Sequence, residues 1–185
     1  DVSIIEDSKE IFENIKKVRP VMHNISNIVT ANDCANITLA CGGSPTMADD
    51  PDEVEDILVL PGGRTANRLL CLEPNKLKII KAAAQEADIC MMIANGSSVL
   101  AQTGLLYHRQ IADYPGEENW KRMFTAEIRR GQNAKWISDG KYYSSSSTMA
   151  GFDMALGVIS DMVDIELAVH IANELGYEWN QEMIF

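Results

Sequence analysis

The clearest structural signal in the sequence is the segment DILVLPGG at residues 56–63. It holds four consecutive apolar residues bounded by Pro61 and two glycines, a pattern typical of a strand that is covered on both faces. A second run of this kind, ICMMI at residues 89–93, follows a helical pattern over residues 75–87. Two buried strands joined by a helix predict a parallel sheet with helices packed against it.

Working outward in both directions, further strands and helices alternate along the chain. Additional strands are predicted over residues 20–25, 45–48, 135–137 and 141–145, and the last two flank Asp139-Gly140, a strong two-residue hairpin turn. Additional helices are predicted over residues 6–18, 30–40, 149–163 and 166–175. In an open α/β sheet the ligand site lies at the carboxyl ends of the strands. The corresponding positions are residues 24–27, 61–65, 94–97 and 112–116.

The composition narrows the class of protein. The chain has 185 residues, and its 27 acidic residues against 16 basic ones give a net charge of -11. This balance argues against a nucleic-acid or anionic-membrane surface, because both require a basic patch. No apolar run approaches the roughly 20 residues needed to span a bilayer. We therefore expect a cytoplasmic protein with neither a nucleic-acid nor a membrane partner, and a single domain over residues 1–185.

The four cysteines show no spacing that suggests a metal site or a redox pair. Cys34, Cys41, Cys71 and Cys90 form no CxxC motif, and no Cys/His cluster has zinc-ligand spacing. Each lies in an apolar neighbourhood, which is typical of a buried free thiol. We expect no metal and no cofactor.

Residues from about 10 to 56 resemble the N-terminal part of hydroxyethylthiazole kinase. The resemblance is carried by RPVMHNISNIVT at residues 19–30, AN at 35–36 and GGSPTMA at 42–48. It implies that Asn27, Val29 and Met47 form a site for a thiazole alcohol. The nucleotide-binding half of that family and its anion hole have no match in this chain.

From about residue 56 to residue 185 the chain resembles the DJ-1/PfpI superfamily. The carrying motifs are DILVLPGG (56–63), Gly96, LAQTGLL (100–106), DGK (139–141), AGFDMAL (150–156) and LGYEWN (175–180). The resemblance implies a flavodoxin-like three-layer αβα sandwich with a mainly parallel sheet. It also implies a homodimer, although the early helices that commonly pair in that family lie in the other segment here.

The chemistry of the DJ-1/PfpI superfamily depends on a cysteine at a strand-to-helix elbow. The resemblance places Ala94 at this position, followed by Asn95 and Gly96, and places Tyr114 where a histidine is common. The acidic partner of the thiol would come from the first βα unit, which is replaced here. No catalytic residue is therefore assigned, and this elbow is expected to be vestigial.

Several residues keep two interpretations. Gly62 and Gly63 can present backbone N–H groups to an anion, as part of an oxyanion hole by resemblance, or can simply form a tight turn. Cys90 can be a displaced nucleophile or a core residue. The histidines His23, His108 and His170 are better explained as structural than as catalytic.

The two resemblances meet near residues 49–57, so the chain looks like a recombined or engineered chimera. The first interpretation is a scaffold without efficient catalysis. The alternatives are a DJ-1/PfpI-type hydrolase or hydratase with an altered site, and a weak thiazole-alcohol binding module. No physiological small-molecule ligand is assigned.

Overall fold

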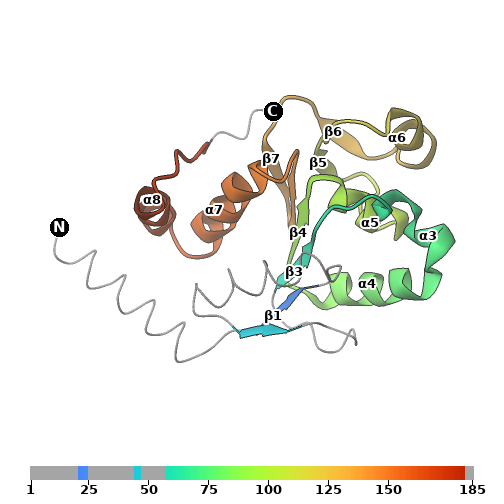
Figure 1. The fold of residues 1–185 in the computed structure, drawn as a ribbon, viewed down its shortest axis with the longest axis horizontal. Coiled ribbons are helices and arrows are strands. Elements are labelled where there is room, and N and C mark those ends of the chain that lie inside the picture. Colours follow the sequence, from blue (N-terminus) through green and yellow to red (C-terminus); the bar gives the residue numbers. More distant parts are fainter. Residues whose placement is uncertain (1–20, 25–43, 47–56, 182–185) are drawn as a thin grey trace.

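The computed structural model describes residues 21–24, 44–46 and 57–181. Six strands within these ranges form one sheet in the order β2-β1-β3-β4-β8-β7 (Figure 1). The strands are β1 (Val21–Asn24), β2 (Ser44–Thr46), β3 (Ile57–Leu60), β4 (Ile89–Ile93), β7 (Trp136–Asp139) and β8 (Tyr142–Ser145). Every neighbouring pair is parallel except the β7–β8 hairpin. The prediction of a mainly parallel sheet is confirmed.

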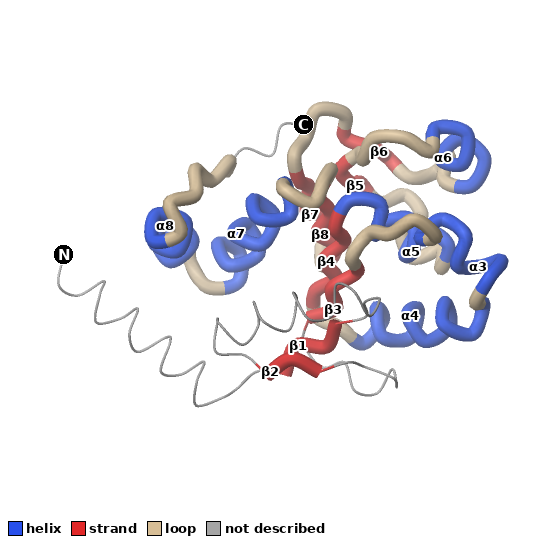
Figure 2. Tube along the Cα trace, viewed as in Figure 1, coloured by secondary structure: helices blue, strands red, loops and turns tan. Residues whose placement is uncertain are grey.

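Helices cover both faces of this sheet (Figure 2). On one side lie α3 (Leu69–Leu72), α4 (Pro74–Glu86) and α5 (Ser97–Gln102), with the short helices η2 (Ala66–Arg68) and η3 (Ala94–Gly96). On the other side lie α7 (Ala150–Met162) and α8 (Ile165–Glu174). The result is a three-layer αβα sandwich, as the sequence predicted.

Alternation along the two central strands explains how both faces are buried. Successive side chains of a strand point to opposite faces, so an all-apolar strand needs a cover on each side. Leu58 of β3 and Cys90 of β4 belong to the core that α4 closes with Leu77 and Ile80. The alternate residues of each strand face the other way. Met91 of β4, for example, packs against the cluster that contains Met154 and Val158 of α7.

A small second sheet lies above the six-stranded sheet in the view of Figure 1. Strands β5 (Gln110–Ala112) and β6 (Arg129–Gly131) form a separate parallel pair, and α6 (Glu118–Phe124) connects them. No range for α6 or β6 was predicted from the sequence. Their signal is weak because α6 has only seven residues and β6 three, one of them Gly131.

Two sequence-based expectations need correction. Asp139 pairs with Tyr142 in the β7–β8 ladder, so the hairpin turn consists of Gly140 and Lys141 rather than Asp139 and Gly140. Gly140 has the positive φ of 62° that this turn requires. Cys71 is exposed rather than buried, because α3 is too short to turn all of its apolar residues inward. The predicted helices at 6–18 and 30–40 lie outside the described residues.

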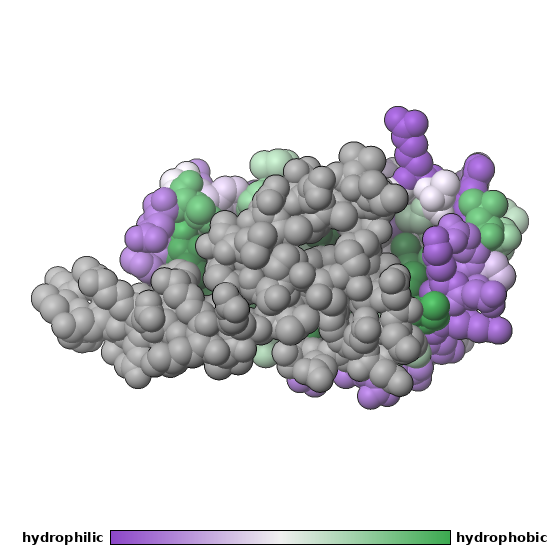
Figure 3. All heavy atoms as spheres, turned by 60° about the horizontal axis from the view of Figure 1, so that its bottom comes forward, coloured by the Kyte–Doolittle hydropathy of each residue, from purple (hydrophilic) through white to green (hydrophobic). Residues whose placement is uncertain are grey.

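The described surface carries hydrophilic side chains interrupted by separate hydrophobic spots, some of which are visible in Figure 3. Among residues 57–181, no helix has the length and apolarity needed to cross a membrane.

Candidate functional site

The turn from β4 into α5 adopts an unusual backbone conformation at Ala94. This residue has a φ of 51°, in the left-handed region that residues with a Cβ rarely occupy. Such strain costs on the order of 1 kcal/mol, and it is typical of functional turns in which a side chain must stand out from the end of a strand. Ala94 itself is half-buried. Ala94 therefore combines a strained backbone at a strand-to-helix turn with a side chain that is only a methyl group.

The glycine turn after β3 is tied directly to this elbow. The backbone N–H of Gly63 donates to the Asn95 Oδ1 atom over 3.0 Å, and the Asn95 Nδ2 atom donates to the Gly63 carbonyl over 2.9 Å. A Cβ on Gly62 would collide with the Asn95 side chain. The structure thus brings together Gly62, Gly63, Ala94 and Asn95, which the sequence analysis had singled out from separate segments.

Close backbone packing fixes the distance between the two turns. A Cβ on Gly96 would collide with the Leu60 carbonyl oxygen and would lie 3.0 Å from the Leu60 carbonyl carbon. Only a glycine allows the start of α5 to approach the end of β3 this closely. The proximity of the glycine turn and the elbow therefore depends on Gly96.

Ser145 supports the elbow from the neighbouring strand β8. The Ala94 N–H donates to the Ser145 Oγ atom over 3.3 Å, and this hydroxyl donates to the Ser147 carbonyl over 3.0 Å. Ser145 is buried, so these partners satisfy a hydroxyl that water does not reach. Parallel pairing of β8 with β4 is what brings Ser145 to the elbow.

Tyr114, at the position where a histidine was expected by resemblance, lies in a buried hydrogen-bonded cluster. Its hydroxyl pairs with the Ser98 Oγ atom of α5 and donates to the Glu117 Oε2 atom over 3.0 Å. Burial, opposed in part by the Ser98 hydrogen bond, raises the pKa of Tyr114 to about 12. A phenol with this pKa stays protonated near neutral pH, so it is a hydrogen-bond donor and not a base.

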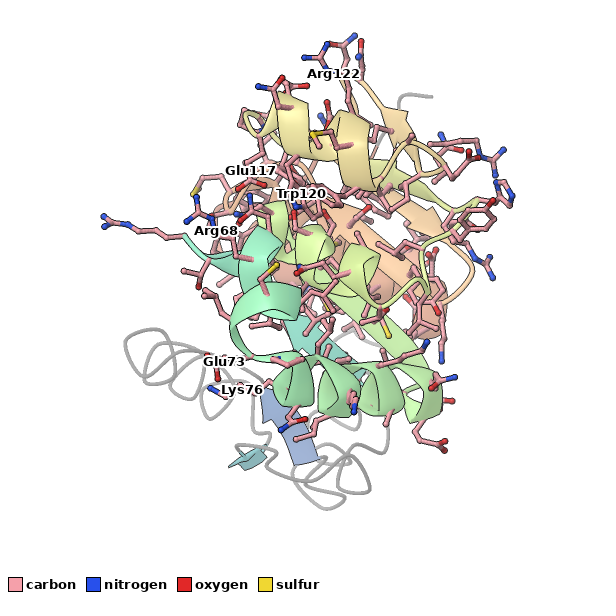
Figure 4. All side chains as sticks on the ribbon, turned by 90° about the vertical axis from the view of Figure 1, so that its right-hand side faces the viewer. Arg68, Glu73, Lys76, Glu117, Trp120 and Arg122 are labelled. Carbon is pink, nitrogen blue, oxygen red and sulfur yellow. The ribbon has the colours of Figure 1, made fainter. Side chains whose placement is uncertain are left out.

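Charged groups surround the same tyrosine. The Lys121 side chain is only 4% exposed, and its Nζ atom contacts the Asp113 Oδ1 atom at 2.9 Å and also the Tyr114 carbonyl. Arg130 lies over the Tyr114 ring, with its Cζ atom 5.4 Å from the centroid. Figure 4 shows Glu117 below α6, on the side toward α3 and α5. Glu117 directly precedes α6; its carboxylate accepts from Tyr114, and its backbone has a φ of 59°.

The two cysteines of the described residues differ in burial, and the buried one lacks the properties of a nucleophile. Cys90 is fully buried, and desolvation raises the pKa of its thiol to about 11, with Lys141 opposing the shift. Its Sγ atom contacts the Ala84 carbonyl at 3.5 Å, which is the environment of a core residue. Cys71 is exposed on α3. Cys34 and Cys41 lie outside the described residues.

Some of the remaining candidate residues lie within the described part of the chain and others lie outside it. His108 is exposed and His170 is partly exposed. The His108 Nδ1 atom lies 3.9 Å from the Glu127 Oε2 atom, and the His170 Nε2 atom lies 3.7 Å from the Glu174 Oε1 atom. The thiazole-site residues Asn27, Val29 and Met47 lie outside the described residues. Their flanking strands, β1 and β2, belong to the same sheet as β3, and Asn24 of β1 pairs with Val59. Within the described residues, no group of three or more His, Cys, Asp or Glu side chains could hold a metal ion.

Comparison with solved structures gives one consistent result for the fold. DJ-1beta of Drosophila melanogaster superposes with a TM-score of 0.65 at 15% identity, covering 86% of this chain and 97% of that one. A mutant of a DJ-1 superfamily protein from Salmonella typhimurium gives a TM-score of 0.64 at 16% identity, over 86% and 98% of the two chains. The chain has the flavodoxin-like fold of DJ-1/PfpI superfamily proteins over most of its length.

Comparison of sequences points to a different family for the first half. The family model of hydroxyethylthiazole kinases matches residues 12–100, which extends past the junction expected near 49–57. Hydroxyethylthiazole kinase of Clostridium acetobutylicum is 56% identical over 80 residues, 43% of this chain and 29% of the kinase. That of Alkaliphilus metalliredigens is 56% identical over 54 residues, 29% of this chain and 20% of the kinase. The chain spans less than a third of the length of these relatives. Its N-terminal region resembles one family while its fold is that of another.

Proposed function

We propose that this protein is a DJ-1/PfpI-like scaffold without efficient catalysis at its elbow. The observation that carries the proposal is Ala94: it keeps the strained left-handed backbone of a nucleophile elbow but bears only a methyl group. A methyl group cannot attack a carbonyl or a nitrile-like carbon, so the covalent step of such chemistry has no reacting atom there.

The rival reading, a hydrolase or hydratase with a relocated nucleophile, has little support among the described thiols. A cysteine nucleophile must reach its substrate as a thiolate, which requires exposure and a lowered pKa. Cys90 has the opposite properties, because it is buried and its pKa is raised to about 11. Cys71 is exposed, but it sits on α3 without the backbone arrangement of the elbow.

Turnover and thiol labelling together test the proposal. We expect the purified protein to convert generic ester, glyoxal and isonitrile substrates no faster than buffer. With iodoacetamide at pH 8, mass spectrometry of the digested protein should show Cys71 labelled at least tenfold faster than Cys90, because Cys90 is buried and holds its proton. Turnover above buffer that disappears in Cys90→Ala would contradict the proposal, whereas Cys71→Ser is the matched control.

A second candidate function is weak binding of a thiazole alcohol, and the 56% identity to hydroxyethylthiazole kinase over 80 residues favours it. Asn27, Val29 and Met47 would line this site. Calorimetry with 4-methyl-5-hydroxyethylthiazole at millimolar concentration is the test. Saturable heat that is lost in Met47→Ala but kept in Met123→Ala would support binding, and the absence of heat would remove the candidate.

We also propose that the chain is a single domain, recombined or engineered, in which residues 1–56 complete the sheet of the remainder. We propose a cytoplasmic location. A homodimer remains a prediction from the resemblance. Pairing of β1 with β3 supports the single domain. Removal of residues 1–56 would leave β3 as an unpaired apolar edge strand, which favours aggregation. We expect a chain of residues 57–185 to elute as aggregates in size-exclusion chromatography, and a monodisperse folded product would contradict the single-domain proposal.

A further inference from the structure

Side chains of the protein itself bind backbone groups at the elbow and at the neighbouring glycine turn. Gly63 lies in the turn next to Ala94, and its N–H and carbonyl are both used by the carboxamide of Asn95, at 3.0 and 2.9 Å. The Ala94 N–H is used by the Ser145 hydroxyl. Backbone N–H groups beside an elbow are the groups that stabilise an oxyanion in acyl transfer. Here, the Gly63 N–H cannot donate to a bound molecule while the Asn95 side chain is in place.

We propose that Asn95 is a positioning residue that closes this elbow by acting as an internal ligand of Gly63. The inference rests on the proposed absence of catalysis and deepens it. It gives the lack of activity a second cause, besides the lack of a nucleophilic side chain at residue 94. A carboxamide suits this role because it offers one acceptor and one donor to the backbone pair of a single residue. Gly62 leaves room for this arrangement, because a Cβ on residue 62 would collide with the Asn95 Oδ1 atom.

The two causes of the lack of catalysis can be separated by introducing a nucleophile at residue 94. In Ala94→Cys, a thiolate can attack p-nitrophenyl acetate: a C–S bond forms, the ester C–O bond breaks, and the electron pair leaves with p-nitrophenolate. The thiol proton goes to solvent, and the carbonyl oxygen carries negative charge in the intermediate. Alkylation by iodoacetamide consumes the same thiolate but develops no oxyanion. The ratio of acylation rate to alkylation rate therefore reports the Gly63 N–H and cancels changes in thiol pKa.

The experiment measures this ratio at the introduced thiol, by mass spectrometry of its peptide, in Ala94→Cys alone and combined with changes at residue 95. With Asn95→Ala, and with Asn95→Gly as a second variant in case the first fails to fold, we expect the ratio to rise about tenfold or more. With Asn95→Asp the ratio should not rise, because a carboxylate oxygen still accepts from Gly63. Asn119→Ala, on the exposed face of α6, is the matched amide control and should leave it unchanged.

Two outcomes overturn the inference: equal ratios in Ala94→Cys with and without Asn95, or an equal rise in the Asn95→Asp variant. Either result leaves the proposed function standing, because that proposal concerns the chain with Ala94. Conversely, turnover by the unsubstituted protein would refute the proposed function, while the ratios within the Ala94→Cys series would still decide the role of Asn95.

Discussion

Two turns of this molecule share a strained backbone but are stabilised in opposite ways. At the elbow, Ala94 has a φ of 51°, and in the loop between β5 and α6, Glu117 has a φ of 59°. The elbow is held by close backbone packing and by the neutral side chains of Asn95 and Ser145. The loop is held by charges and by Tyr114, with Lys121 buried beneath it.

The two turns differ in whether their backbone conformation depends on the side chain of the strained residue. The partners of the elbow bind its backbone, so its conformation does not require any particular side chain at residue 94. The loop depends on its own side chains, because the Glu117 carboxylate accepts from Tyr114 and the Lys121 ammonium bridges to Asp113. A backbone conformation that rests on such contacts does not depend on which side chain residue 94 carries. The following substitutions test this contrast, from the largest expected effect to the smallest.

Gly96→Ala should have the largest effect, because its Cβ would meet the Leu60 carbonyl and force β3 and α5 apart. We expect the free energy of unfolding to fall by about 3 kcal/mol, the upper range for overpacking. Urea denaturation followed by circular dichroism measures this. Gly63→Ala is the control, since its Cβ position has no neighbour within 4 Å, and it should cost less than about 1 kcal/mol. Equal losses would mean that backbone packing does not hold the elbow.

Lys121→Met should lower the free energy of unfolding by about 2 kcal/mol, because it removes the cation from a buried site and leaves Asp113 and the Tyr114 carbonyl with fewer donors. The same urea titrations apply. In the control, Lys76→Met removes an exposed ion pair to Glu73 and should change stability by less than about 0.5 kcal/mol. If Lys121→Met were as stable as the unsubstituted protein, the loop would not depend on its charges.

Ala94→Gly should have the smallest effect and the opposite sign. Glycine relieves the left-handed strain, worth about 1 kcal/mol, but increases the entropy of the unfolded chain, so a net gain of about 0.5 kcal/mol is expected. Ala101→Gly in α5 places the same change in an ordinary helix and should cost about 1 kcal/mol. A loss of stability in Ala94→Gly would show that the methyl group makes contacts that outweigh the strain.

Prediction from the sequence was most successful where apolar residues follow one another without interruption. The runs at 57–60 and 89–93 have no polar residue to interrupt them, so their strands were predicted with the bounds that the structure has. It was less successful at the β5–α6–β6 unit, whose elements are short and mixed in polarity. The hairpin turn was misplaced by one residue, since register depends on which residues pair across the strands and not on the Asp-Gly pair alone.

The candidate site was predicted unevenly for a similar reason. Gly62 and Gly63 were found because glycines follow an apolar run at a strand-to-helix turn, whereas Ala94 was assigned by the resemblance to the DJ-1/PfpI superfamily. The roles of Ser145 and Glu117 had no such signal, because each depends on a partner from another part of the chain: Ser145 reaches Ala94 only after β8 pairs with β4.

The fold class and the lack of a thiol at residue 94 could be read from the sequence, because apolar periodicity and residue identity are properties of the local chain; the assignment of residue 94 as an elbow came from the family resemblance. Only the tertiary structure decided that residue 94 adopts the left-handed conformation and that Asn95 occupies the Gly63 backbone. The physical reason is that hydrogen bonds and close contacts between segments about 30 to 50 residues apart exist only once the sheet has brought β3, β4 and β8 together.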